Sequence, residues 1–201
     1  MASCNLLDSG PPQRIVRIKA LADPSFRARN PRWEEELRGF IESASDYYER
    51  EFDIRLVTQA TAPWPAEERI PSTANLLVKL RQEFPPQKND DSYDLVVAFT
   101  SESVSRYLPS GRPRVDRIGN CQQGLGNYVV TTAHSVFRYQ GANSEPEFDV
   151  LALVHELGHV FGAVHVDDTS SIMHDPFDYR TEFDLGNRSI IQKNRTCAFA
   201  R

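Results

Sequence analysis

The chain has 201 residues, enough for one domain with a sizeable hydrophobic core. Hydrophobic residues make up 40% and charged residues 25%, a balance that excludes a disordered or fibrous protein. The net charge of −5, without a long run of basic residues, argues against a nucleic-acid-binding protein. No apolar stretch approaches the 18 residues of a membrane-spanning helix, so we expect no transmembrane segment.

The N-terminus suggests where the protein is found. Residues 1–13 include a Gly-Pro-Pro run and predict a flexible leader. The chain starts Met-Ala-Ser-Cys, and Ala-Ser-Cys resembles the end of a bacterial lipoprotein processing site. One hypothesis is therefore a secreted or surface-anchored protein with Cys4 as its lipid-bearing residue, and an ordinary N-terminal cysteine is the alternative. Among the three cysteines at most one disulfide can form; Cys121 with Cys197 is the most plausible pair, and the sequence leaves open whether it forms.

Strand and helix patterns alternate in the N-terminal half. The predicted elements are a strand at residues 14–21, a helix at 31–51 capped by Asn30, a strand at 52–59, a helix that begins after Ser72, and a strand at 93–100. This order is typical of a mostly parallel sheet with crossover helices.

The middle of the chain gives weaker signals. The acidic run at residues 89–91 lacks the ligand spacing of a calcium loop, so we interpret it as solvated surface and do not predict calcium. Residues 101–113 predict a surface loop, and two further strands follow at 115–121 and 127–133. His134 comes directly after the last of these strands, and we interpret it as a surface or loop residue.

The sequence HELGHVFGAVH carries the clearest chemical signal. Histidines four apart lie on one face of a helix, so His155 and His159 can bind the same zinc ion. Glu156 can reach a water on that ion and act as general base. Gly162 can take the left-handed conformation that ends a helix, and the turn brings His165 back as a third ligand. Three neutral imidazoles leave one zinc position open, as in catalytic sites.

The segments around this motif predict how it is held. Ser144 and Glu147 are spaced as a capping box, so we expect the zinc helix to begin there. The helix is apolar nearly all round, which is typical of a buried central helix. A final helix is predicted over residues 184–195.

The motif, followed by Ser-Ile-Met-His at residues 171–174, resembles the signature of the metzincin clan of zinc endopeptidases, in which a methionine turn follows the third histidine. The short link from His165 to Met173 is most similar to matrixins. Val166, however, matches none of the residues that the named subfamilies place after the third histidine. Archaemetzincins carry a second, cysteine-based zinc site just after the motif, and nothing here supplies it. We therefore expect a divergent metzincin outside the named subfamilies.

The resemblance implies an α/β (α+β) fold. It consists of a twisted, mostly parallel five-stranded sheet with an antiparallel edge strand, two backing helices, a central zinc helix and a small C-terminal lobe. We place the antiparallel edge at residues 115–121 and the inner strand at 127–133. Residues 14–201 would then form one catalytic domain, with an upper lobe at 14–162 and a lower lobe at 163–201.

The resemblance also implies a mechanism, zinc-dependent hydrolysis of peptide bonds by an endopeptidase. Zinc bound by His155, His159 and His165 would activate a water, with Glu156 as general base. Met173 would form an apolar floor beneath the imidazoles, as the residue of the Met-turn.

The resemblance also suggests where a substrate binds. A protein or peptide substrate would add as an extra strand along the uncovered edge of the sheet. Candidate pocket residues are His174, Phe177 and Tyr179, although packing in the C-terminal core explains them equally well. We expect a monomer. Two alternatives stay open, namely a zinc hydrolase acting on a non-protein amide or a short peptide, and a non-catalytic binding module with the metzincin fold.

Overall fold

The computed structural model describes most of the chain, namely residues 13–65, 73–85, 92–101, 114–133, 137, 139–175 and 178–200. Several predictions concern other residues and so lie outside the described ones. They are the leader at residues 1–12, Cys4, Ser72 before the second predicted helix, the acidic run at 89–91, the surface loop at 102–113, His134 and Phe177.

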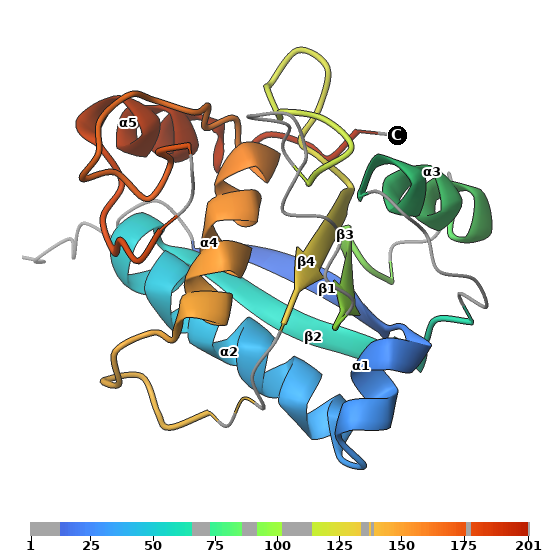
Figure 1. The fold of residues 1–201 in the computed structure, drawn as a ribbon. Helices are drawn as coiled ribbons and strands as arrows, with labels where there is room; N and C mark the ends of the chain where they lie inside the picture. Colours follow the sequence, from blue (N-terminus) through green and yellow to red (C-terminus); the bar gives the residue numbers. More distant parts are fainter. Residues whose placement is uncertain are drawn as a thin grey trace, which may run out of the picture.

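Strands and helices alternate through the first half of the chain, and the last two helices follow the final strand (Figure 1). The elements are β1 (Arg14–Ala22), α1 (Pro24–Arg29), α2 (Trp33–Phe52), β2 (Ile54–Pro63), α3 (Thr73–Glu83), β3 (Leu95–Thr100), β4 (Tyr128–Thr132), α4 (Phe148–Val160) and α5 (Leu185–Asn194). The four strands form one parallel sheet in the order β2-β1-β3-β4. The predicted mixed α/β fold with a mostly parallel sheet is therefore confirmed.

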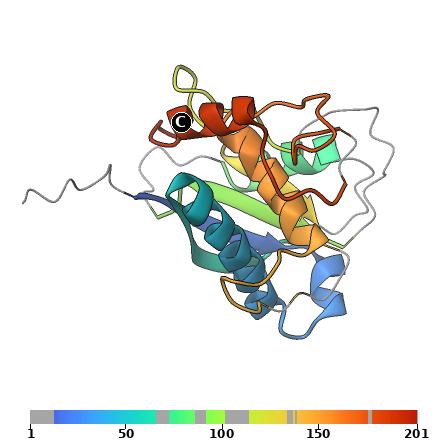
Figure 2. The same cartoon turned by 90° about the vertical axis from the view of Figure 1, so that its left-hand side faces the viewer.

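The sheet is covered on both faces, which explains why β3 is an uninterrupted apolar run. Its residues Val97 and Phe99 belong to the core that contains the buried sides of α2 and α4. The alternate residues Val96 and Ala98 belong to a smaller core under α3. Figure 2 shows α5 beside the C-terminal end of α4. Helix α4 thus lies between the sheet and the C-terminal segment.

The sheet has one strand fewer than predicted among the described residues, because the antiparallel edge expected at residues 115–121 is reduced to a single bridge. Val115 pairs in antiparallel fashion with Val129 on β4. The chain then leaves the sheet, and the Gly119 N–H donates a hydrogen bond of 2.9 Å to the carbonyl oxygen of His159. Satisfying the carbonyls at the end of α4 competes with extending the strand.

The first helices differ from the prediction in two respects. A short helix, α1, that the sequence analysis did not predict follows β1, and the Asp23 side chain caps it by accepting the Phe26 N–H at 2.7 Å. Asn30 does not cap α2, whose cap position is Arg32. The Asn30 side chain instead accepts the Arg32 N–H at 2.9 Å, in the turn before the helix.

The start of α4 also differs from the prediction. The helix begins at Phe148, and the Ser144 hydroxyl donates to the Gly141 carbonyl at 2.7 Å. Ser144 therefore closes a turn four residues before the helix, and the predicted capping box is wrong. Helix α5 does begin where predicted, with the Asp184 side chain accepting the Asn187 N–H at 2.9 Å.

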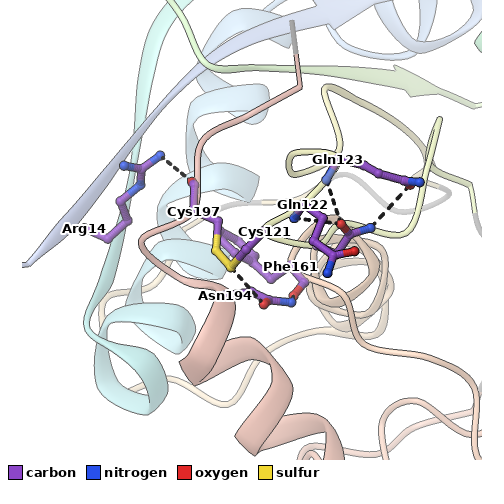
Figure 3. The surroundings of a disulfide bond; sticks show 8 residues. Arg14, Cys121, Gln122, Gln123, Phe161, Asn194 and Cys197 are labelled. Carbon is purple, nitrogen blue, oxygen red and sulfur yellow. Dashed lines mark hydrogen bonds between the residues drawn. A yellow bond between two sulfur atoms is a disulfide. The ribbon is translucent and has the colours of Figure 1, made fainter.

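A disulfide joins Cys121 to Cys197, a pairing that the sequence left open (Figure 3). Asn194 lies beside it, with Oδ1 at 3.4 Å from the Cys121 sulfur and Nδ2 donating to the Phe161 carbonyl at 2.9 Å. The loop after the edge segment and the C-terminal segment are thus fastened to the end of α4. The division into two lobes stays a prediction. Of the helices described, none is long and apolar enough to cross a membrane.

Candidate metal centre

Three imidazoles meet at one point beside α4. His155 and His159 lie one turn apart on the helix with their Nε2 atoms 3.2 Å apart. The Nε2 atom of His165 lies 3.1 Å from each of them. The first two residues are buried and the third is half-buried. The structure therefore brings together the three histidines that the spacing predicts.

The outer ring nitrogens of the helical pair are held by backbone carbonyls. His155 Nδ1 lies 2.7 Å from the Ile172 oxygen, and His159 Nδ1 lies 2.8 Å from the Ala163 oxygen. A carbonyl oxygen can only accept, so in each ring Nδ1 carries the proton. Both Nε2 atoms consequently turn an unprotonated lone pair toward the meeting point.

The electrostatics of the site favour neutral rings and a bound cation. Burial, with a smaller contribution from His159, lowers the pKa of His155 to about 3, and burial lowers the pKa of His159 to about 4. Lone pairs that face one another at such short distances repel unless a cation lies between them. Tetrahedral zinc, with Zn–N bonds of about 2.0–2.1 Å, places its nitrogen ligands about 3.3 Å apart. The observed separations fit such an ion.

His165 reaches this point through a turn at Gly162. Gly162 has φ of 102°, a conformation that residues with a Cβ rarely adopt. A Cβ on this residue would lie 2.5 Å from both the Gly119 oxygen and the Asn194 side-chain nitrogen. Only glycine therefore fits this turn.

Met173 packs against α4 at Gly158, and its role as a Met-turn residue stays a prediction. Its side chain is fully buried, and its sulfur would lie 3.0 Å from a Cβ added to Gly158, which stands between the two ligands in sequence. The absence of a side chain at Gly158 makes room for Met173 and for the ring of Phe183.

The predicted pocket residues are more scattered. His174 is half-buried, and its Nδ1 lies 3.1 Å from the Val166 carbonyl oxygen. Tyr179 is 51% exposed, and its hydroxyl donates to the Pro146 carbonyl at 3.4 Å, before the start of α4. The contact with Val166 puts His174 beside the segment that follows His165. The contact with Pro146 puts Tyr179 near the N-terminal end of α4. Their pocket role stays a prediction.

Glu156 is buried and faces the edge of the sheet. Its Oε2 atom accepts the backbone N–H of Arg114 at 2.7 Å. Burial raises the pKa of the Glu156 carboxyl to about 7, although the charge and the N–H of Arg114 oppose the shift. A carboxyl with this pKa can accept and release a proton near neutral pH.

Arg114 was missed by the sequence analysis. Its backbone N–H holds Glu156, and its Nη1 donates to the Thr132 hydroxyl at 2.9 Å, so the residue is fixed between α4 and the end of β4. Every residue except proline has such an N–H, so the contact with Glu156 leaves no signal in residue type or spacing.

Comparison with known proteins identifies the family. The family model described as metallo-peptidase family M12 matches residues 12–201. The chain belongs to metallo-peptidase family M12. The M12 assignment makes it a zinc-dependent peptidase at the level of the family, and it names a family where the motif had indicated only a divergent member of the metzincin clan.

Among solved structures, the archaemetzincin of Methanopyrus kandleri is similar to this M12 chain with a TM-score of 0.51. The two are 22% identical, and the match covers 94% of this chain and 98% of the archaemetzincin chain. At this identity the likeness shows the fold, which is metzincin-like. The M12 family match and this fold together agree with the predicted metzincin clan. No curated protein matches the chain.

Proposed function

We propose that this M12 family member is an endopeptidase whose zinc ion is held by His155, His159 and His165. The observation that carries the proposal is the convergence of their three Nε2 atoms to within 3.2 Å. Within the described residues, the group that could hold the ion has these three members. A tetrahedral ion held by three protein ligands keeps a fourth position for water or substrate, as catalytic zinc sites do.

The bound zinc would polarise the scissile carbonyl and lower the pKa of water. Glu156 is the proton carrier of the proposed reaction. The Arg114 N–H occupies Oε2, which leaves Oε1 to accept the proton of the attacking water. As the water oxygen bonds to the carbonyl carbon and the C–N bond breaks, Glu156 delivers this proton to the leaving amine. Met173, in a role that resembles the Met-turn residue, supports the helical ligands from behind.

The edge segment at residues 114–116 offers a place for an extended substrate. Val130 N–H donates to the Arg114 oxygen at 2.9 Å, and Asp116 N–H donates to the Tyr128 oxygen at 3.2 Å. In this antiparallel pattern the N–H and C=O of Val115 point away from β4. A substrate peptide can pair with them as an additional strand, next to the carboxyl of Glu156. An edge that no described residue pairs with suits a chain that continues in both directions, which favours an endopeptidase.

The test replaces the proposed base. Glu156→Gln should lower kcat/KM by about 10²–10⁴-fold, because the amide cannot accept the proton, while zinc stays bound at one ion per chain. Glu145→Gln, at an exposed position before α4, is the matched control and should retain full activity. Full activity of Glu156→Gln, or wild-type protein that binds no zinc, would refute the proposal.

The choice of substrate separates the alternatives. Cleavage of a long unstructured protein supports an endopeptidase, whereas cleavage limited to short blocked peptides or other amides supports the second type of zinc hydrolase. Peptide binding without any cleavage would indicate a binding module.

The Cys121–Cys197 disulfide supports a secreted or surface location, because disulfides persist in oxidising compartments. Recovery of the protein from the cytosol of its source cells would contradict that location.

A further inference from the structure

The residue before His165 is held by a single side chain from α5. Asn187 Oδ1 accepts the Val164 N–H at 2.9 Å, and Asn187 Nδ2 donates to the Val164 oxygen at 3.0 Å. Both hydrogen-bonding groups of the Val164 backbone therefore pair with one carboxamide, 23 positions along the chain. Asn187 is buried, with 1% of its surface exposed, so water does not compete for these bonds.

The orientation of this carboxamide is fixed by Asp184. Asn187 Nδ2 also donates to Asp184 Oδ2 at 2.7 Å, while Asp184 Oδ1 accepts the backbone N–H of Asn187 at 2.9 Å. The carboxylate of Asp184 and the carbonyl of Val164 are both acceptors, so only the NH₂ end of the side chain can face them. The amide therefore has one allowed orientation, and it satisfies Val164.

The same carboxylate reaches the segment beneath the imidazoles. Ser171 Oγ donates to Asp184 Oδ2 at 2.8 Å and accepts the Met173 N–H at 3.1 Å. Ile172, between these two residues, supplies the carbonyl that holds His155 Nδ1. One polar network thus fixes the backbone next to His165 and the backbone that orients His155.

The other neighbour of His165 is held as well. The Val166 N–H donates to the Met173 carbonyl at 3.2 Å, and the Val166 carbonyl lies 3.1 Å from His174 Nδ1. Hydrogen bonds from the protein itself therefore hold the backbone on both sides of His165.

We propose that Asn187 is a positioning residue of the metal centre, which sets the place of His165 by holding Val164. The inference rests on the proposed function, because it assumes that His165 binds the ion. Outer partners of this kind typically change metal affinity by about 10–100-fold when they are lost, since a misplaced ligand binds more weakly.

The main test variant is Asn187→Asp, which keeps the size of the side chain. We call the two hydrogen bonds between Asn187 and the Val164 backbone the Asn187 clamp. The variant retains an acceptor for the Val164 N–H, but it places an oxygen against the Val164 carbonyl and the Asp184 carboxylate, so repulsion replaces one of the two bonds of the clamp. Ile191→Ala is the control, because Ile191 is a fully buried residue on the same helix whose side chain belongs to the main hydrophobic core. We expect both substitutions to destabilise the protein, but only the first to disturb Val164.

Three measurements on the whole chain decide the outcome. We expect Asn187→Asp to weaken zinc binding by about 10–100-fold in competition with a chelator, and to change the visible absorption spectrum of the Co²⁺-substituted protein. We expect kcat to fall more than KM rises, because the substrate site is untouched. Ile191→Ala should lower the unfolding temperature while leaving the zinc affinity and the Co²⁺ spectrum unchanged.

Equal zinc affinity and an unchanged Co²⁺ spectrum in Asn187→Asp would overturn the inference. Should that variant not fold, Asn187→Ala removes the clamp without adding a charge, and the same criteria apply to it. An effect of equal size in Ile191→Ala would also overturn the inference, because it would mean that general destabilisation explains the loss. Wild-type protein without zinc would instead refute the proposed function, so the two failures are distinguishable.

Discussion

His155 and His159 stand on a buried helix, whereas His165 stands on a segment that is largely open to solvent. The two helical histidines are 5% and 0% exposed, while Val164, next to the third, is 42% exposed. A separation of four residues on a helix fixes the first pair almost by itself, because it is close to one full turn. His165 has no such local rule. Its position depends on a turn at Gly162 and on contacts with residues far along the chain.

This difference indicates which of the three histidines is held less firmly. Helix α4 lies in the main core of the protein, so its opening requires much of that core to open. The segment at residues 164–170 has few buried apolar side chains and is held by individual hydrogen bonds. Removing the ion or one of those bonds should therefore affect the third ligand first.

Metal removal should give the largest effect. Zinc at about 1,000 times its dissociation constant stabilises the folded state by about 4 kcal/mol, and that stability is lost with a chelator. We expect amide hydrogen exchange to accelerate mainly at residues 163–174, while the amides of α4 keep most of their protection. Exchange followed by mass spectrometry with and without chelator measures this. Equal acceleration in α4 would break the distinction between the two regions.

Replacing the turn glycine should come next. Gly162→Ala puts a Cβ 2.5 Å from the Gly119 oxygen at a φ of 102°, so we expect a loss of about 3 kcal/mol or more in unfolding free energy, together with weaker zinc binding. Gly141→Ala is a matched control, because Gly141 has φ of 103° and open space around it. It should cost only about 1–2 kcal/mol and leave zinc affinity unchanged. Equal losses in urea unfolding would show that the contacts around Gly162 are unimportant.

The predictable parts of this protein are those with a short-range pattern. The buried run of β3, the apolar stripe of α2 and the histidine spacing on α4 all follow from periodicity, and the structure has these elements where they were expected. Gly162 was predictable too, because a turn after a helix needs a left-handed residue. The M12 family match then agrees with the chemistry that the motif indicated.

The wrong predictions and the missed contacts involve competing hydrogen bonds or residues that are far apart in the sequence. Ser144 has the right residue type and spacing for a cap, but its hydroxyl bonds back to Gly141 and the helix begins later. The pairing of Asn187 with Val164 joins a side chain to a backbone across 23 positions, and no residue pattern marks it. Arg114 holds Glu156 with a backbone N–H, so any residue but proline would serve. Such contacts become visible only in three dimensions.

Lowering the pH should give the smallest effect. It allows a comparison of Asp184, near the metal centre, with Asp94, which lies just before β3. Burial raises the pKa of each carboxyl, but hydrogen bonds lower it by more. Asp184 accepts hydrogen bonds from Asn187 and Ser171, and Asp94 accepts them from Arg17, so the pKa of each carboxyl lies below its usual range. A lowered pKa in the folded state means that each carboxylate stabilises the protein above about pH 4, and that this contribution is lost as the pH falls through the folded value. Metal-free Asp184→Asn and Asp94→Asn should each be less stable than wild type at pH 7, by about 1 kcal/mol, and the difference in unfolding free energy should narrow as the pH falls below about 4.

Only Asp184→Asn should also accelerate amide exchange around Val164 and Ser171, because only Asp184 supports the Asn187 clamp. Urea unfolding across the pH range and exchange at pH 7 measure the two effects separately. A stability gap that stays constant down to pH 2 would contradict the assigned pKa shifts. The same loosening in Asp94→Asn would mean that the segment bearing His165 responds to stability anywhere in the fold, and that the network from α5 does not hold it specifically.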